Sequence, residues 1–176
     1  MKIYLAADHR GFEFNEKIKV WLGKQGYQIV DFGNDHYDPD DDYPDFAQKL
    51  VRRLVFNRDR VADRFAHQGK QAFTSSQKTS PPFYRDPKDQ DKGILFCGSG
   101  IGVDIVANRF AGIRCGLGFA PKQVKHGRQN DDINCLALPA DFLSLEKAKK
   151  IVAMFLETEF DGKVSHKRRI KKIDSR

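Results

Sequence analysis

The stretch DKGILFCGSGIGVDIVANR, residues 91–109, decides the fold class of this chain. A short apolar run ends at Cys97, three glycines then alternate with Ser99 and Ile101, and a segment with helical spacing follows. This order is typical of a buried strand that leads through a glycine-rich loop into a helix. Strand–helix units of this kind build parallel sheets.

The same alternation of strand-like and helix-like segments continues on both sides of this unit. Strands are predicted at 2–7, 27–32, 93–97, 113–119 and 135–138. Helices are predicted at 12–25, 43–56, about 102–110, about 121–129 and 144–160. The pattern predicts an α/β fold with a five-stranded parallel sheet that helices cover on both faces. Ligands of such sheets lie beyond the carboxyl ends of the strands.

The chain of 176 residues has the length of one domain, so we take 1–176 as a single domain. Residues 57–91 break the strand–helix rhythm with a polar, turn-rich stretch, and we expect its second half, 74–90, to be a loop. Residues 57–91 are either a surface insertion without a function or a functional segment, which would be a lid or a subunit contact. A basic arm, 163–176, ends the chain.

The charge and the hydropathy limit the classes of partner. The net charge is +7, and the basic arm supplies about +6 of it. The arm lacks interleaved aromatic residues and no nucleic-acid module accompanies it, so it favours an anionic small molecule or an acidic partner over nucleic acid. No apolar stretch approaches the ~20 residues of a membrane span. Charged residues follow the start too early for a secretory signal, so we expect a cytoplasmic protein.

The three cysteines do not form a recognisable framework. Their odd number and wide spacing argue against disulfides, and no Cys/His cluster has the spacing of a zinc site. Cys115 and Cys135 lie in apolar runs and are expected to fill the core. The acidic stretch around His36, residues 35–42, matches no calcium loop and is read as a solvated loop. We therefore expect no metal and no cofactor.

Cys97 differs because it lies where a strand meets the glycine loop. Unpaired amides at the start of the following helix would attract an anion, whether a phosphate or an enediolate oxygen, and would favour the thiolate form of Cys97. A nucleotide would suit the glycines too, although a cysteine directly before the first glycine is unusual for a dinucleotide fingerprint. Asp8 and His9 end the first strand and share this rim of the sheet.

Four segments together resemble the ribose-5-phosphate isomerase B and galactose-6-phosphate isomerase family. They are AADHRGF (6–12), DYPDFA (42–47), FCGSGIGVDIVANRFAGIR (96–114) and RQNDDIN (128–134). The resemblance implies a Rossmann-like three-layer α/β/α subunit that forms a homodimer, with a tetramer left open, and builds each site from both chains. It also implies a metal-free aldose–ketose isomerase that acts on a small sugar phosphate through a cis-enediolate.

The resemblance also implies roles for individual residues. Cys97 matches the base that moves a proton between C1 and C2, and the backbone of Gly98, Ser99, Gly100, Ile101 and Gly102 matches the anion hole, with Ser99 counted among the catalytic residues. The positions that match sugar or phosphate contacts are Asp8, His9, Tyr43, Asp131 and Arg169, with Arg168 as a further tail cation.

Three positions depart from the family pattern. Asn130 stands where the family carries a ring-opening histidine, and Asp141 and Ser165 stand where it carries arginines. Asparagine cannot exchange a proton at neutral pH. His126, four residues earlier on the same predicted helix, is a candidate substitute. These departures leave open a non-catalytic or altered-specificity sugar-phosphate-binding paralogue.

Overall fold

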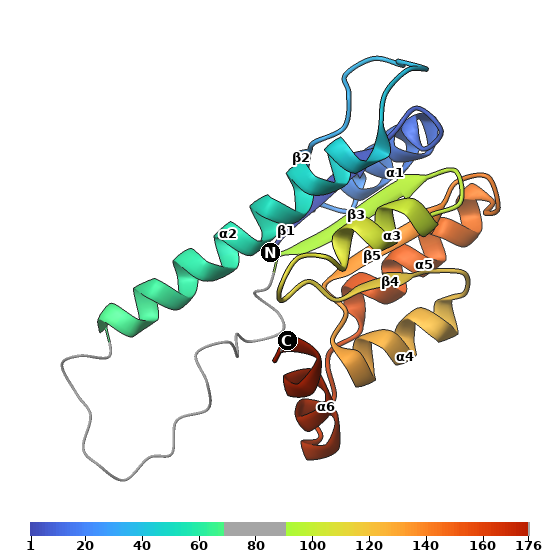
Figure 1. Cartoon of the computed structure of the whole chain (residues 1–176). Helices are drawn as coiled ribbons and strands as arrows, with labels where there is room; N and C mark the ends of the chain where they lie inside the picture. The colour runs from blue at the N-terminus through green and yellow to red at the C-terminus, as the bar shows by residue number, and fades with distance from the viewer. Residues whose placement is uncertain (69–90, 176) are drawn as a thin grey trace, which may run out of the picture.

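The described residues form one five-stranded, fully parallel sheet with helices on both faces (Figure 1). This computed structural model describes residues 1–68 and 91–175. The strands are β1 (Lys2–Ala7), β2 (Gln28–Asp31), β3 (Lys92–Cys97), β4 (Cys115–Leu117) and β5 (Cys135–Pro139), in the order β2-β1-β3-β5-β4. The helices are α1 (Phe12–Lys24), α2 (Tyr43–Gln68), α3 (Ile101–Ala107), α4 (Pro121–Asp131), α5 (Leu145–Glu157) and α6 (Val164–Asp174).

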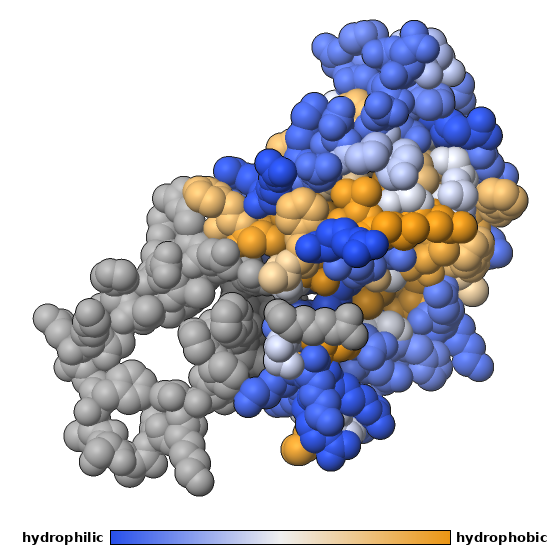
Figure 2. Space-filling model, in the orientation of Figure 1, coloured by the Kyte–Doolittle hydropathy of each residue, from blue (hydrophilic) through white to orange (hydrophobic). Residues whose placement is uncertain are grey.

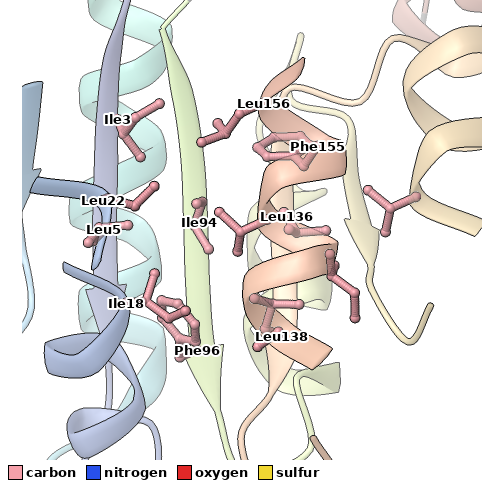
Figure 3. Close-up of a cluster of buried hydrophobic side chains, with 14 of the residues drawn as sticks. Ile3, Leu5, Ile18, Leu22, Ile94, Phe96, Leu136, Leu138, Phe155 and Leu156 are labelled. Carbon is pink, nitrogen blue, oxygen red and sulfur yellow. The ribbon is translucent and has the colours of Figure 1, made fainter. Parts of the chain in front are cut away.

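Two hydrophobic clusters hold the helices against opposite faces of the sheet. Ile18 of α1 and Phe155 of α5 are buried against one face, beside Leu136 of β5 (Figure 3). Leu50 of α2 and Val103 of α3 are buried against the other face. Burial of the strands on both sides is what parallel sheets require. The predicted three-layer α/β/α arrangement is thus confirmed.

The connections diverge between β1 and β3, and this topological switch point is where such sheets bind ligands. From β1 the chain runs through α1, on one face, to β2; from β3 it runs through α3, on the other face, to β4. The register pairs Ala7 with Phe96. The loops that begin at Asp8 and Cys97 therefore leave the sheet side by side.

Two predicted elements differ most from the observed ones. Helix α2 does not stop at Phe56 but continues to Gln68, into the segment expected to be an insertion (Figure 1). Strand β4 is shorter than 113–119, because it is an edge strand that pairs only with β5. The loop predicted at 74–90 lies outside the described residues. None of the described helices has the length and hydrophobicity that crossing a bilayer requires.

A buried lysine begins β3, at the end of the sheet opposite the switch point. Lys92 is only 3% exposed, and its Nζ lies 3.4 Å from Sδ of Met1. Burial, helped by the positive charge of Arg128, lowers the pKa of Lys92 to about 8. The unfolded chain therefore binds this proton more tightly than the folded chain between about pH 8 and pH 10.5.

We expect Lys92→Met to stabilise the protein at neutral pH and to remove part of its pH dependence. Stability of the wild type should rise with pH across this window by ~3 kcal/mol, because the cost of burying the charge disappears as the folded and then the unfolded lysine deprotonate. Urea unfolding of both proteins from pH 7 to 10 measures the difference. Parallel stability curves for wild type and variant would contradict this expectation.

Candidate active site

Cys97 and Asp8 lie next to each other at the switch point, on the same face of the sheet. Side chains alternate along a strand, so Asp8 follows Ala6 and Cys97 follows Leu95 on the face that α2 and α3 cover. Cys97 is 5% exposed, and its Sγ accepts a hydrogen bond from the Gly100 amide at 3.1 Å. This contact holds the sulfur against the start of the glycine loop.

The glycine loop is shaped by close packing as much as by conformational freedom. Gly100 has φ +72°, and a Cβ there would lie 3.0 Å from the backbone nitrogen of Pro139. The Ile101 amide donates to Ser99 Oγ at 3.3 Å. Two amides of the predicted anion hole, those of Gly100 and Ile101, are thus used within the loop. In the described chain the amides of Gly98, Ser99 and Gly102 have no protein acceptor, so they are the donors left for an anion.

Tyr43, the first residue of α2, packs directly on the glycine loop. A Cβ at Gly102 would lie 2.7 Å from two carbons of the Tyr43 ring, so only glycine fits beneath this ring. Tyr43 remains 38% exposed. The helix can start at this point because Pro44 occupies its first turn, where no amide hydrogen is needed. The structure therefore brings Tyr43 to the loop that follows Cys97.

Asp8 forms the turn that carries the next two site residues. Its Oδ1 accepts a hydrogen bond from the Gly11 amide at 2.9 Å, and a Cβ on Gly11 would lie 2.6 Å from Cβ of Phe96. The turn is therefore pressed against the end of β3. Burial raises the pKa of Asp8. The carboxyl group thus both caps the turn and lies beside Cys97.

His9 is held by a carboxylate from the acidic stretch. Asp41 Oδ1 accepts a hydrogen bond from the His9 amide at 2.9 Å and lies 2.8 Å from Nδ1 of the ring. The hydrogen bond to Asp41 raises the pKa of His9, which increases the protonated fraction near neutral pH. Asn34 contacts the second oxygen of Asp41 at 3.2 Å. The prediction that residues 35–42 are only a solvated loop is wrong for Asp41.

Asp141 lies at the same site, on the loop that follows β5. Its amide donates to the carbonyl oxygen of Gly98 at 3.1 Å, and its Oδ2 accepts a hydrogen bond from Arg10 Nε at 3.0 Å. The position where the family pattern has an arginine therefore still faces the glycine loop. The residue at this position, Asp141, carries a negative instead of a positive charge, and it forms an ion pair with Arg10.

The remaining predicted site residues lie elsewhere within the chain. His126, Asn130 and Asp131 are all on α4, and Asn130 and Asp131 are at its end, shortly before β5 begins. Cys97 pairs with Pro139 at the opposite end of β5. The strand between them spans about 13 Å. Within one chain, Asn130 and Asp131 therefore lie near the opposite end of the strands from Cys97.

His126 and Asp131 of α4 border a separate cavity. It has a volume of about 570 Å³, and its lining includes Cys115, His126, Asp131 and Ile173. It lies beside the edge strand β4, away from Cys97. The tail residues Arg168 and Arg169 are exposed on α6, which lies against α4. A single chain therefore has two separate groups of predicted site residues.

The sequence of the whole chain matches a known family. A family model described as ribose/galactose isomerase matches residues 3–64 and 85–173. The chain belongs to the ribose/galactose isomerase family. Its relatives include ribose-5-phosphate isomerases of type B. Residues 65–84, which lie within the segment predicted to be an insertion, are not matched.

Relatives and solved structures agree with this assignment along almost the full chain. A probable ribose-5-phosphate isomerase B of Mycoplasma genitalium is 32% identical over 171 residues, which are 97% of this chain and 92% of that protein. A ribose 5-phosphate isomerase of Thermotoga maritima superposes with a TM-score of 0.78 at 35% identity, covering 99% and 98% of the two chains. The Mycoplasma genitalium isomerase B with bound ribulose-5-phosphate has a TM-score of 0.78 at 31% identity, with 98% and 93% covered.

Two site residues of this isomerase were missed at the level of sequence. Asp41 is one of several aspartates in an acidic stretch, and only the fold shows which of them reaches His9. Its position just before the DYPDFA segment is the one signal that could have marked it. Arg10 was part of a quoted motif, but its partner Asp141 is 131 residues away in the sequence.

Proposed function

We propose that this isomerase interconverts the aldose and ketose forms of a small sugar phosphate, of the ribose 5-phosphate and ribulose 5-phosphate type. The observation that carries the proposal is Cys97, whose Sγ lies against the Gly100 amide at the switch point, beside Asp8. The relative solved with bound ribulose-5-phosphate supports the choice of substrate class.

Cys97 is the proposed base of the reaction. Its thiolate takes the proton from C2 of the aldose, and the electron pair left on C2 forms the C1–C2 double bond of a cis-enediolate. The C1 oxygen then carries negative charge, which the free amides of Ser99 and Gly102 stabilise. Cys97 returns the proton to C1, and the C2 oxygen, after losing its hydrogen to the C1 oxygen, becomes the carbonyl.

The geometry of α4 supports a site shared between the two chains of a homodimer. Asp131, Asn130 and the tail arginines contribute to the site of the partner, since they lie too far from Cys97 within their own chain. Ile101 and Ile105 of α3 are 52% and 50% exposed. Figure 2 shows a band of hydrophobic surface on this face of the molecule. Burying such a surface against a second copy would stabilise the dimer.

Turnover in D₂O tests the proposal. The purified enzyme, incubated with ribose 5-phosphate, is expected to produce ribulose 5-phosphate and to incorporate deuterium at the carbon that receives the proton. Proton NMR follows both processes. A panel of pentose, hexose and tetrose phosphates identifies the preferred chain length. Absence of turnover and of exchange for every member of the panel would reject the isomerase proposal.

A sugar-phosphate-binding paralogue without turnover is the second candidate. It is favoured by Asn130, Ser165 and Asp141, of which Asp141 is paired with Arg10 and carries the wrong charge to bind phosphate itself. Such a protein would bind the same sugar phosphates in calorimetry but exchange no deuterium. The D₂O experiment therefore separates the two candidates.

A further inference from the structure

The ion pair between Arg10 and Asp141 lies directly on the glycine loop. A Cβ at Gly98 would lie 2.6 Å from Arg10 Nε and 2.6 Å from Asp141 Oδ2. Both hydrogen bonds from Arg10, from Nε and from Nη2, end on this same Oδ2. Gly98 follows Cys97 directly, so the guanidinium is a fixed positive charge at the entrance to the loop.

Backbone contacts hold each member of the pair in place. Arg10 belongs to the turn that Asp8 caps and that Gly11 packs against Phe96. Asp141 is fixed by its own amide, which donates to the carbonyl oxygen of Gly98 at 3.1 Å. The two residues thus come from the loops after β1 and β5 and meet over the loop after β3. Their geometry is set by the sheet and not by chance contact of long side chains.

The pair is nevertheless open to exchange with a ligand. The Arg10 side chain is 58% exposed and that of Asp141 is 35% exposed. Exposed ion pairs stabilise a fold only weakly. Asp141 uses two of the five N–H donors that a guanidinium offers, and a phosphate dianion matches the guanidinium fork with more charge than a single carboxylate. The neighbouring His9, held by Asp41, adds a second donor on the same turn.

We propose that Arg10 binds the anionic group of the substrate and that Asp141 is its internal counter-ion, which the substrate's phosphate displaces. This proposal rests on the proposed function and names the phosphate-recognition residue of the same site. Asp141 then sets the affinity for anions: it keeps Arg10 in position when the site is empty, and it weakens the binding of every anion by competing for the guanidinium. Two residues that form one ion pair therefore have opposite effects on binding.

Variants of the two residues test the proposal through the sign of their effects. Arg10→Gln is expected to raise KM for ribose 5-phosphate by ~10-fold or more, with a smaller effect on kcat, because a charge-assisted contact to phosphate is lost. Asp141→Asn is expected to lower KM, because Arg10 loses its competitor. The exposed pair of Glu13 and Lys17 on α1, at 3.1 Å, provides the matched control. Glu13→Gln and Lys17→Gln should leave KM unchanged.

A purely structural ion pair would give a different pattern. Both variants would then lower the melting temperature and shift KM in the same direction or not at all, and this result would overturn the proposal. Should Arg10→Gln fold poorly, Arg10→Lys serves instead. It keeps the charge but not the planar fork, so an intermediate rise of KM supports the proposal and an unchanged KM contradicts it.

Binding of inorganic phosphate separates this proposal from the proposed function. Calorimetry on the wild type and on both variants requires no turnover. If phosphate binding weakens in Arg10→Gln and tightens in Asp141→Asn while no sugar phosphate is converted, the isomerase proposal fails and the assignment of Arg10 stands. If the wild type converts substrate but phosphate binding is the same in all three proteins, the assignment of Arg10 fails.

Discussion

Replacing Cys97 with alanine is expected to lower kcat by ~10³-fold or more, since proton transfer by a positioned base contributes about 10²–10⁴-fold. Deuterium incorporation into ribose 5-phosphate should fall by the same factor, because the same proton transfer limits both. Binding of the sugar phosphate should persist, because the loop, Arg10 and His9 remain in place. Proton NMR measures the exchange, and calorimetry measures the binding.

Cys135→Ala is the matched control for this loss of a thiol. Cys135 is fully buried on the neighbouring strand β5, so its replacement removes a sulfur from the same sheet and costs stability without touching the switch point. Activity at 25 °C should survive in this variant. Deuterium exchange that is unchanged in Cys97→Ala, or equally reduced in Cys135→Ala, would refute the assignment of Cys97 as the base.

The topology of the sheet could be predicted because local sequence patterns specify it. Each strand is a short apolar run, and each helix between strands has one apolar face. For helix α2, however, these local patterns predicted an end that is too early in the sequence. After Tyr43 the chain has no glycine until Gly69, and helix-forming residues continue through a polar segment. The polarity of residues 57–68 places them in the segment that breaks the strand–helix rhythm, whereas it is also the composition of a helix that extends beyond the sheet (Figure 1).

The backbone of the candidate site could be predicted, but its ion pairs could not. A cysteine followed by alternating glycines marks a strand end and a tight loop, and the structure confirms this local geometry. The carboxylates that hold His9 and Arg10 lie 32 and 131 residues away from them. No local pattern distinguishes Asp41 from its acidic neighbours. Only the packing of the β1 turn against two other loops selects these partners.

The separation of the site residues within one chain leads to a second prediction with a large expected loss of activity. Cys97 lies at the carboxyl end of the strands, whereas Asp131, the last residue of α4, lies near their amino end. A closed two-fold dimer brings the same patch of both chains together, so each site would take Cys97 from one chain and Asp131 from the other. Asp131→Ala should then lower kcat/KM by about 10- to 100-fold, as expected when a hydrogen bond to the substrate is lost.

Mixing the two defective chains is expected to restore activity. When Cys97→Ala and Asp131→Ala chains are unfolded together and refolded in equal amounts, half of the dimers contain one chain of each kind. In these mixed dimers one site carries both defects and the other carries none, so about a quarter of all sites should be intact. Activity should therefore rise to about a quarter of the wild-type value, from at most about a tenth for either variant refolded alone. Each variant refolded alone is the control, and no gain in the mixture would mean that each site is built within a single chain, which the distance across the sheet argues against.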